Sequence, residues 1–461
     1  MENSPLVIHE AQQARLPVIT ADAGGMAEFV RDAVNGFTYE HRSTHALQSA
    51  LQRGADDTPS LARLGSRGYL YSEDGQVPCI NEHIDTLQRL YASMRASAAA
   101  PRTAPPPLFR RAGPWRITFD TNPDDCNYQC VMCEGFSEHS DVQSSRVKSG
   151  ARRRRADPAL IASSVRSAIP HGLREIVPST MGEPLMWRHF DVFLDLCREF
   201  APQLKLNLTT NGSFPSNGVR QGVDAWAAAL LPVLSDVKFS WNAATKATQE
   251  AVMKNANFDQ QLANLQAFLR ARDAAAALGG NRASVTLQLT FMERNAPEFP
   301  KIVELAAKLG VDRVKGHHLW AHWSAMDGQN FRRDAAAAQR WNEIAAACRA
   351  AAAENPRLGG GFVSLQNFED LNLEELGSRR ALMAPNDAAC PFLGEELWVN
   401  SRGRIDPCCA PDEKRKLLGG FGSVDRPGGI LAAWRSEEYR ALMRDYASHP
   451  VCKQCNMRRR V

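Results

Sequence analysis

The chain has 461 residues, of which 44% are apolar and 23% charged, and its formal net charge is +4. This length allows two or three domains, and the composition is that of an ordinary globular protein. So small a net charge gives no indication of a polyanionic partner.

Two basic runs, Arg152–Arg155 and Arg458–Arg460, have no interleaved aromatic residues. We therefore expect a solvated loop and a frayed tail there, and no nucleic-acid partner. No apolar stretch approaches the roughly 20 residues of a membrane span. The start, Met-Glu-Asn-Ser-Pro, lacks the basic and apolar segments of a signal peptide. These observations predict a cytoplasmic protein without a membrane span.

Residues 1–95 have an α/β, Rossmann-like pattern. Pro5–Ile8 leads into an expected helix that runs through Arg15, followed by a short strand at Leu16–Thr20 and a second helix at Met26–Asp32. A Gly-Gly pair precedes the second helix, where backbone N–H groups are able to approach a phosphate. Residues 60–95 have the pattern of closing helices. Residues 96–114 open with a Pro/Ala-rich run and form the expected linker.

Residues 115–355 alternate between strand and helix patterns. The expected strands are residues 115–120, 175–179, 205–209, 237–240, 285–290 and 311–317. Asp157, Asn295 and Asp334 are expected N-caps, and Gly310 closes a helix. Helices are also expected at residues 223–234, up to about residue 277, and up to residue 353. The pattern predicts a parallel sheet in a partial (βα)6 TIM-like barrel, with its site at the C-terminal ends of the strands.

Three of the eleven cysteines, Cys126, Cys130 and Cys133, lie in one loop after the first expected strand. Thiolates are the usual ligands of iron–sulfur clusters, and a cubane needs four. Three ligands would leave one iron open for substrate, as a catalytic metal requires. A zinc knuckle or reduced structural thiols are the alternatives. Cys197 and Cys348 lie in helical apolar patterns, and we expect them to be buried.

Polar residues follow several of the expected strands. The second strand is followed by Gly182, Glu183 and Pro184, the third by Thr209 and Asn211, and the fourth by Ser240 and Asn242. Each group alone is compatible with a turn or a helix cap.

The sixth strand ends in Gly-His-His-Leu-Trp-Ala-His-Trp. We expect His317, His318 and His322 to line a substrate pocket with the two tryptophans. A metal site and a packed core are the alternatives. Glu293, after the fifth strand, is a further pocket candidate.

Residues 356–461 contain a second group of cysteines. Cys390 precedes an expected hairpin at Leu397–Ile405 with Gly403 in its turn, and Cys408 and Cys409 follow directly. A helix is expected from residue 430 to residue 446, and Cys452 and Cys455 are near the end of the chain. An iron–sulfur site and a four-cysteine zinc ribbon both fit this order.

The first cysteine loop, C-x3-C-x2-C, resembles the signature of radical S-adenosylmethionine (radical SAM) enzymes. The resemblance implies that Cys126, Cys130 and Cys133 hold a [4Fe–4S] cluster whose open iron binds the methionine part of S-adenosylmethionine. Reductive cleavage then gives a 5′-deoxyadenosyl radical. Met132 replaces an aromatic residue that is frequent in the family.

The same resemblance extends to the polar residues after the strands. Gly182, Glu183 and Pro184 match most of a G-G-E-P-like motif that holds the methionine amino group, with Met181 in place of the first glycine. The family places features such as Thr209 and Asn211 beside the methionine or ribose. Ser240 and Asn242 match positions that often contact the ribose.

The C-terminal cysteines resemble the SPASM or twitch extensions of radical SAM enzymes. The full SPASM pattern has seven cysteines, and five are present here. The resemblance implies one auxiliary [4Fe–4S] cluster held by Cys390, Cys408, Cys452 and Cys455. The choice between Cys408 and Cys409 as ligand stays open. Cys409 could instead donate a hydrogen atom to a product radical, as in some radical epimerases.

The order of features in the first segment resembles the C-terminal lobe of retaining glycosyltransferases with two Rossmann domains. Glu2 and Glu10 match its E-x7-E carboxylates, and the Gly-Gly pair matches its donor-binding helix terminus. The acceptor lobe and the first strands of the donor lobe are absent. We therefore expect no transferase activity from this chain alone, which is either a remnant or the end of a longer fused enzyme.

Together these resemblances predict a radical SAM oxidoreductase or maturase, with His317, His318 and Cys409 as catalytic candidates. The glycosyltransferase-like segment favours a sugar or glycan substrate, to be dehydrogenated or epimerised. Modification of a ribosomally made peptide or a protein side chain is the enzyme alternative. A zinc-stabilised, non-catalytic module is the alternative from another class. The expected partners are a small-molecule or peptide substrate and an electron donor such as flavodoxin or ferredoxin.

Overall fold

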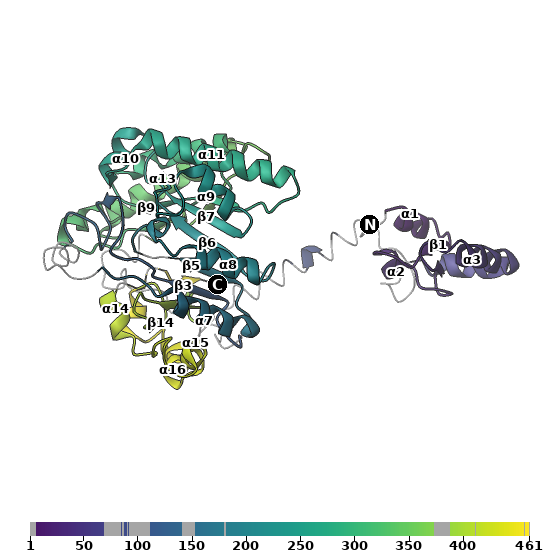
Figure 1. Cartoon of the computed structure of the whole chain (residues 1–461). Coiled ribbons are helices and arrows are strands. Elements are labelled where there is room, and N and C mark those ends of the chain that lie inside the picture. The colour runs from purple at the N-terminus through teal and green to yellow at the C-terminus, as the bar shows by residue number, and fades with distance from the viewer. Residues whose placement is uncertain are drawn as a thin grey trace. The chain divides into compact units, whose positions relative to one another are not determined.

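The computed structural model divides the chain into two compact units, residues 1–101 and 102–461 (Figure 1). Each unit is described by itself. The residues that the structure describes are 6–68, 84, 87–89, 91, 111–140, 153–178, 181–372, 388–410, 412–455 and 457–460.

The first unit contains a two-stranded parallel sheet of β1 (Val18–Ala21) and β2 (Gly36–Tyr39). Its helices are α1 (Leu6–Gln13), α2 (Met26–Phe29), α3 (Thr44–Asp56) and α4 (Thr58–Ser66). Phe37, Ala50 and Leu64 form its small core. The second helix is three residues shorter than expected, because Val30 is extended and buried. Glu10 is exposed, and Glu2 lies outside the described residues.

The second unit is built on a sheet whose six barrel strands lie in chain order and are all parallel. These strands are β3 (Arg116–Phe119), β5 (Glu175–Pro178), β6 (Lys205–Thr210), β7 (Leu234–Ser240), β9 (Ser284–Phe291) and β10 (Arg313–His318). The predicted (βα)6 partial barrel is confirmed. Ser179, the expected last residue of the second strand, lies outside the described residues.

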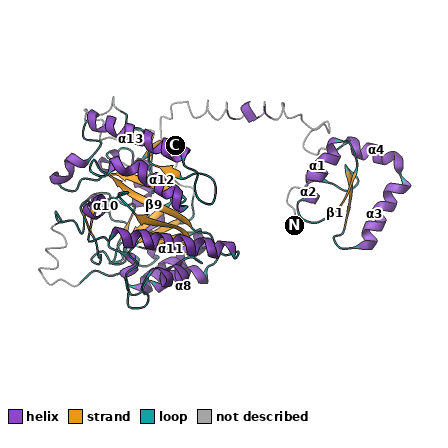
Figure 2. Ribbon diagram, turned by 90° about the horizontal axis from the view of Figure 1, so that it is seen from above, coloured by secondary structure: helices purple, strands orange, loops and turns teal. Residues whose placement is uncertain are grey.

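Helices follow the barrel strands and surround the sheet (Figure 2). They are α7 (Pro158–Ala168), α8 (Asp191–Glu199), α9 (Val223–Leu230), α10 (Lys246–Val252), α11 (Phe258–Ala277), α12 (Phe299–Leu309) and α13 (Ala335–Glu354). Asp157 and Asp334 cap α7 and α13 as predicted, since their side chains accept hydrogen bonds from the N–H groups of Ala159 and Ala337. Gly310 ends α12 in the left-handed conformation.

Three local expectations in the barrel are wrong. The helix expected to reach residue 234 ends at Leu230, because Leu234 pairs with Leu206 at the start of β7. The long helical region after β7 is divided by the short strand β8 (Met253–Lys254). Asn295 does not cap a helix with its side chain, which accepts a hydrogen bond from the Met292 N–H and donates to the carbonyl oxygen of Asn242.

Each barrel strand presents two different faces, because successive side chains point to opposite sides. The face beneath the helices is apolar and buried, and includes Ile117, Phe119, Leu206, Leu208, Val237, Phe239, Leu287 and Leu289. The opposite face has polar residues such as Asn207, Lys238 and Gln288. One side of the sheet is therefore the hydrophobic core, and the other is free to form a polar site.

The C-terminal residues extend the barrel sheet. Strand β13 (Glu396–Val399) pairs in parallel with β3, and β14 (Ile405–Asp406) is antiparallel to β13. This confirms the predicted hairpin, in which Gly403 has a φ of +83°. At the other edge, β11 (Ser364–Gln366) pairs in parallel with β10. Residues after 355 thus continue the sheet at both of its edges.

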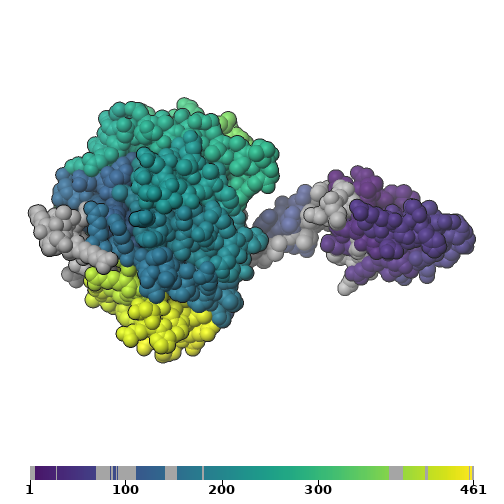
Figure 3. Space-filling view, in the orientation of Figure 1, coloured from purple at the N-terminus to yellow at the C-terminus, as the bar shows by residue number. Residues whose placement is uncertain are grey.

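Short helices complete this region: α14 (Asp412–Leu417), α15 (Gly429–Arg435), α16 (Glu437–Asp445) and α17 (Pro450–Lys453). They are preceded and followed by β12 (Ala388–Ala389) and β15 (Arg459–Arg460), which pair in antiparallel. The single helix expected at residues 430–446 is interrupted at Ser436, whose hydroxyl caps α16. In Figure 3 the yellow C-terminal residues pack directly against the blue start of the barrel. None of the helices within the described ranges is long and apolar enough to cross a membrane.

The basic runs agree only in part with the expected solvated loop and frayed tail, since Arg153 and Arg155 are exposed but also form specific contacts. Arg154 forms an ion pair with Asp124 at 2.7 Å, and Arg153 and Arg155 both pair with Asp125. Arg458 is buried and donates to the carbonyl oxygen of Ala388 at 2.9 Å. Sequence alone did not show this, because the partners are distant in the chain or are backbone atoms. Arg152 lies outside the described residues.

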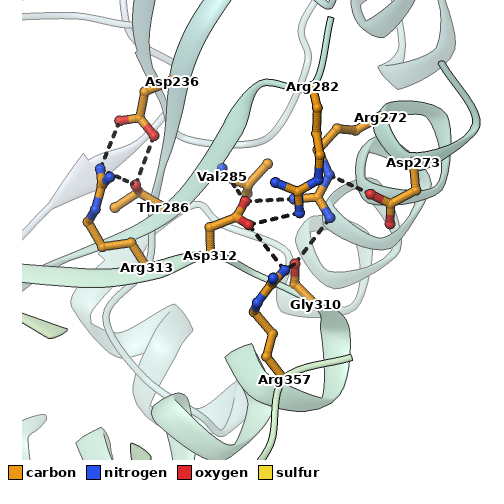
Figure 4. A network of polar contacts seen from close by, with 10 residues as sticks. All are labelled: Asp236, Arg272, Asp273, Arg282, Val285, Thr286, Gly310, Asp312, Arg313 and Arg357. Carbon is orange, nitrogen blue, oxygen red and sulfur yellow. Dashed lines mark hydrogen bonds and ion pairs between the residues drawn. The ribbon is translucent and has the colours of Figure 1, made fainter. Parts of the chain in front are cut away.

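A charged network ties together the N-terminal ends of β9 and β10 (Figure 4). Asp312 forms ion pairs with Arg272 at 2.8 Å, Arg282 at 2.9 Å and Arg357 at 3.1 Å. Its carboxylate also accepts the N–H of Val285 at 2.9 Å. Arg272 is only 1% exposed. One carboxylate therefore fixes α11, two strand starts and the chain after α13.

Candidate active site

A cavity of about 590 Å³ borders the polar face of the sheet and the C-terminal ends of its strands. Nearly all the site residues expected from sequence border it: Cys126, Cys130, Cys133, Gly182, Glu183, Thr209, Asn211, Ser240, Asn242, His317, His318, Cys390, Cys408, Cys409, Cys452 and Cys455. Pro184 is not among the lining residues and begins a short 3-10 helix, Pro184–Met186. Both groups of cysteines thus border one space.

The first cysteine loop is held by main-chain bonds. Its short strand β4 (Gln129–Cys130) pairs in antiparallel with β8, and the Val131 N–H donates to the carbonyl oxygen of Val252 at 3.0 Å. Tyr128 and Val131 are buried against Met253 and Met292. The partly buried Met132 packs on this cluster and borders the cavity. The end of α10 and strand β8 therefore fix the position of the thiols.

The three thiols of this loop are unfavourable sites for negative charge in the bare protein. Burial, together with the charges of Glu183 and Cys133, raises the pKa of Cys126 to about 12. Burial also raises the pKa of Cys130, and repulsion from Cys133 and Cys126 adds to it. Three thiols that repel one another as thiolates need a shared positive centre if they are to be ionised together.

Gly182 brings the loop after β5 against the chain that precedes Cys126. Its φ is +80°, and an added Cβ would lie 2.6 Å from the carbonyl oxygen of Asp125 and closer still to that of Asn122. The Glu183 N–H donates to the Asp125 carbonyl at 2.8 Å, and the Asn122 side chain donates to the Glu183 carbonyl at 2.9 Å. Glycine is required here because two loops meet. Sequence reasoning missed Asn122 and Asp125.

The carboxylate of Glu183 is bound within the protein. It accepts hydrogen bonds from the Thr210 hydroxyl at 2.8 Å, the Asn211 N–H at 2.7 Å and the Leu185 N–H at 3.2 Å. Burial raises its pKa to about 7, although the three hydrogen bonds oppose this. Glu183 therefore fixes the end of β6 next to the cysteine loop.

Asn211 stands at the centre of a network of amides. Its side chain donates to Asn127 Oδ1 at 2.8 Å, and its carbonyl oxygen accepts from Gln261 at 2.6 Å. Asn264 donates to the carbonyl oxygen of Gly212 at 2.9 Å. Sequence reasoning missed Asn127, Gln261 and Asn264. The signal for the last two was a polar pair three residues apart on the buried side of α11.

The two residues expected after the fourth strand differ in their surroundings. Asn242 Oδ1 accepts the Thr290 N–H at 2.9 Å, and the side chain of Gln249 binds the Asn242 N–H. Asn242 therefore joins two strand ends as well as bordering the cavity. Ser240 is partly exposed and borders the same space, as does Thr209.

The three histidines border the cavity but differ in how far they also pack in the core. His317 borders the cavity, and burial lowers its pKa to about 4. His318 also borders it, but its ring packs against Trp341 at 4.8 Å and Phe291 at 5.4 Å. Pocket lining and core packing, two of the alternatives, thus both occur. His322 borders the cavity beside Trp323.

Glu293 is not part of the pocket, contrary to expectation. It forms surface ion pairs with Arg333 at 2.7 Å and Arg340 at 2.6 Å. These arginines come from the chain just before α13 and from the helix itself, so no local pattern around Glu293 indicated them.

The C-terminal cysteines form a second electrostatic group. Burial raises the pKa of Cys390 to about 11 and of Cys452 to about 12. The pKa of Cys408 is raised first by burial and then by the charges of Cys390, Cys455 and Cys452. Burial also raises the pKa of Cys409, and the charges of Cys408 and Glu396 add to this effect.

Tyrosine hydroxyls hold the turn that carries Cys390. Tyr446 accepts the Cys390 N–H at 3.2 Å, and Tyr439 accepts the Gly394 N–H at 3.0 Å. The Leu393 N–H donates to the Cys390 sulfur at 3.5 Å. N–H donors to sulfur are among the contacts that tune iron–sulfur clusters.

The donor sets fit iron–sulfur clusters. Each set consists mostly of partly buried thiols that raise one another's pKa, and the irons of a cluster supply the positive charge that stabilises thiolates. Within the described ranges, no three His, Cys, Asp or Glu side chains form a ready-made site for one metal ion.

Family comparisons match three stretches of the chain. Residues 1–71 match "Glycosyl transferases group 1", residues 123–278 match "Radical SAM superfamily", and residues 390–456 match SPASM, "Iron-sulfur cluster-binding domain". A comparison with curated proteins found no match.

Similar solved structures include SuiB of Streptococcus suis bound to the precursor peptide SuiA. This likeness has 14% identity and a TM-score of 0.50, and covers 89% of this chain and 85% of SuiB. SuiB bound to S-adenosylmethionine has 15% identity, a TM-score of 0.49 and coverages of 90% and 85%. Native anSMEcpe with bound AdoMet has 13% identity, a TM-score of 0.48 and coverages of 71% and 82%.

At such identities these likenesses concern the fold alone. The family matches agree with the two thiol groups and the parallel barrel described above. The corresponding cofactors are S-adenosylmethionine, the [4Fe–4S] cluster that binds it and an auxiliary cluster. The chain therefore contains a radical SAM domain and a SPASM iron–sulfur domain, and it has a glycosyltransferase-like segment at its N-terminus.

Proposed function

We propose that this enzyme cleaves S-adenosylmethionine reductively and abstracts a hydrogen atom from a peptide side chain, which is then oxidised. The observation that carries the proposal is the position of both thiol groups on one cavity of about 590 Å³. This volume lies within the range of small-molecule sites. A substrate group in the cavity would have the initiating centre on one side and the auxiliary centre on the other.

Cys126, Cys130 and Cys133 hold the initiating cluster in this proposal. S-adenosylmethionine bound to that cluster supplies a 5′-deoxyadenosyl radical when one electron arrives. Gly182, Glu183 and Pro184 shape the loop beside the methionine group. The buried Glu183 carboxylate keeps this loop and the end of β6 in register.

The remaining cofactor contacts come from the ends of β6 and β7. Thr209 and Ser240 offer hydroxyl groups to the cavity, whereas Asn211 and Asn242 orient the loops that carry them. His317 faces the cavity as a neutral imidazole, since burial lowers its pKa to about 4. It is able to accept a proton from an oxidised substrate. His318 supports it from the aromatic core.

Cys390, Cys408, Cys452 and Cys455 hold the auxiliary cluster, and Cys409 is the spare thiol. The charges of Cys390 and Cys455 act on both Cys408 and Cys409, so the choice of Cys408 as ligand follows the expectation from sequence. Cys409 borders the cavity and is the candidate hydrogen donor if the reaction is an epimerisation.

The substrate class rests on two different observations. The SuiB structure with a bound precursor peptide has the same fold, which supports a peptide. The glycosyltransferase-like segment favours a sugar, our first expectation from sequence, but the fold comparisons give a sugar no support. A peptide is therefore the first candidate. The reaction needs a one-electron donor such as flavodoxin or ferredoxin, and a cytoplasmic location suits oxygen-sensitive clusters.

The test is release of 5′-deoxyadenosine by the anaerobically reconstituted full chain after addition of dithionite and S-adenosylmethionine. Wild type should release it, and Cys130→Ala should not. Cys197→Ala is the matched control, because Cys197 is a buried thiol of α8 distant from both groups in sequence. Two zinc ions per chain and no labile sulfide would instead support a non-catalytic module.

A further inference from the structure

Arg458 is a buried cation in the second basic run, close to the end of the chain. Its relative exposure is 7%, and it borders the cavity together with the C-terminal cysteines. Arginine is almost never buried so deeply without groups that stabilise its charge, because removing a charge from water is costly. The function proposed above gives this charge no role.

One group of contacts joins Arg458 to the segment that carries Cys390. Its Nε donates to the carbonyl oxygen of Ala388 at 2.9 Å, two residues before Cys390. Its guanidinium carbon lies 5.3 Å from the centre of the Tyr446 ring. The hydroxyl of Tyr446 in turn accepts the Cys390 N–H at 3.2 Å. The guanidinium therefore packs on the side chain that holds the backbone of Cys390.

A second group of contacts joins Arg458 to the last two cysteines of the chain. Its Nη1 donates to the carbonyl oxygen of Cys452 at 3.4 Å, and its backbone N–H donates to that of Cys455 at 3.5 Å. Cys408 borders the same cavity. Arg458 is therefore bonded directly to the segments that carry three of the four thiols assigned to the auxiliary cluster.

Arg444 is a cation of the same region with the opposite environment. It lies in α16, its side chain is 50% exposed, and its partner Glu437 is 70% exposed. Water and dissolved ions screen such a charge, so it should have little influence on a buried centre. Arg444 and Arg458 thus have the same charge but differ in burial.

We propose that Arg458 is the cation of the auxiliary cluster site and that its charge favours the reduced form of that cluster. This inference rests on the proposed function, in which Cys390, Cys408, Cys452 and Cys455 are the cluster ligands. Reduction adds one electron to a centre that four thiolates make negative, and no covalent bond or proton changes place. A fixed positive charge in the same buried space stabilises the added negative charge. Net charge is among the factors that set the potentials of such clusters.

A cation at this place suits the reaction proposed above. After hydrogen abstraction, the substrate radical loses one electron, which the auxiliary centre accepts. A more positive potential of that centre makes the transfer more favourable. Arg458 is thus a positioning residue that acts on the cluster and does not have to touch the substrate.

The experiment is a redox titration of the auxiliary cluster in the anaerobically reconstituted full chain, followed by electron paramagnetic resonance. A background with Cys126, Cys130 and Cys133 changed to Ala isolates the auxiliary signal. Arg458→Met should shift the equilibrium about tenfold towards the oxidised form, which is about 59 mV for a one-electron couple. Arg458→Lys keeps the charge and should restore most of this shift. Arg444→Met removes the exposed charge and should leave the potential unchanged.

An unchanged potential in Arg458→Met, with normal iron content, would overturn the inference, because the arginine would then only hold the end of the chain. Equal shifts in Arg458→Met and Arg458→Lys would also overturn it, because lost contacts and not lost charge would be the cause. A background chain that binds zinc or no iron would refute the auxiliary-cluster assignment, and the inference with it. If Arg458→Met does not retain iron, the titration compares Arg458→Lys with Arg458→Gln, which keeps a donor without the charge. Equal potentials in that pair would contradict the proposed role.

Discussion

The N-terminal and C-terminal ends of the barrel strands differ in how they accommodate charged groups. At the N-terminal ends of the strands, Asp312 binds three arginines, and Asp236 faces Arg313 and Lys238. At the C-terminal ends, thiols, imidazoles and amides border a cavity, and burial disfavours the charged forms of the thiols and imidazoles. The first end holds its charges in pairs, whereas the second needs a cofactor for its thiols to ionise. Stability and chemistry are thus placed at opposite ends, as in closed barrels.

The largest effect on stability should come from the paired end. Asp312→Ala leaves the buried Arg272 without its main partner, and we expect a loss of about 3–5 kcal/mol in the free energy of unfolding. Urea unfolding of the metal-free chain measures it. Asp273→Ala removes the more exposed partner of Arg272 and should cost about 1 kcal/mol or less. Equal losses in the two variants would contradict the central role of Asp312.

A second test uses pH at the cavity end. Asp120, directly after β3, has a pKa raised from 3.8 to about 7, mainly by burial, although Arg415 and Arg154 oppose this. Because the folded value is the higher one, its contribution to stability is complete below about pH 3.8. The contribution is then lost as pH rises through 7.

Asp120→Asn stays neutral and should remove this pH dependence. Between pH 5 and 8, wild type should lose on the order of a few kcal/mol relative to the variant. Urea unfolding of both metal-free chains at several pH values measures the difference. Parallel stability curves would show that Asp120 is ionised throughout.

A third change tests how closely two loops meet at the cavity. Gly182→Ala introduces a Cβ against two carbonyl oxygens at a φ of +80°, and should cost about 1–3 kcal/mol. The strain falls on the loop before Cys126, so the initiating cluster should be lost first. Iron quantitation after reconstitution should show a loss close to one cluster per chain. Gly218→Ala, also at positive φ but with open space around its Cβ, is the control.

The smallest effect should come from the paired end again. Arg282 is 43% exposed in its ion pair with Asp312, and two other arginines remain when it is removed. Arg282→Ala should therefore cost less than about 1 kcal/mol in thermal unfolding. A loss comparable to that of Asp312→Ala would mean that the three arginines are not redundant.

Sequence predicted the parts of this molecule that depend on short-range pattern. The alternation in Lys205-Leu-Asn-Leu-Thr209 identified a strand with one polar face, and Asp157, Asp334 and Gly310 marked helix ends. The cysteine spacing identified both thiol groups, which the structure places on one cavity.

What sequence missed depends on contacts between distant segments. Nothing near Arg154 in the chain indicates Asp124, and nothing near Gly182 indicates the carbonyl oxygens that it meets. Local sequence patterns likewise do not indicate the substrate, because substrate specificity depends on the shape of the finished cavity.

The pairing of β13 with β3 has a mechanical consequence. Arg116 lies opposite Glu396 in the ladder of this strand pair. The segment that carries the C-terminal thiols is therefore paired with the strand that leads into the first cysteine loop. Thermal motion cannot separate these two segments without breaking that ladder. The spacing between them is therefore a fixed property of the fold and does not depend on a hinge.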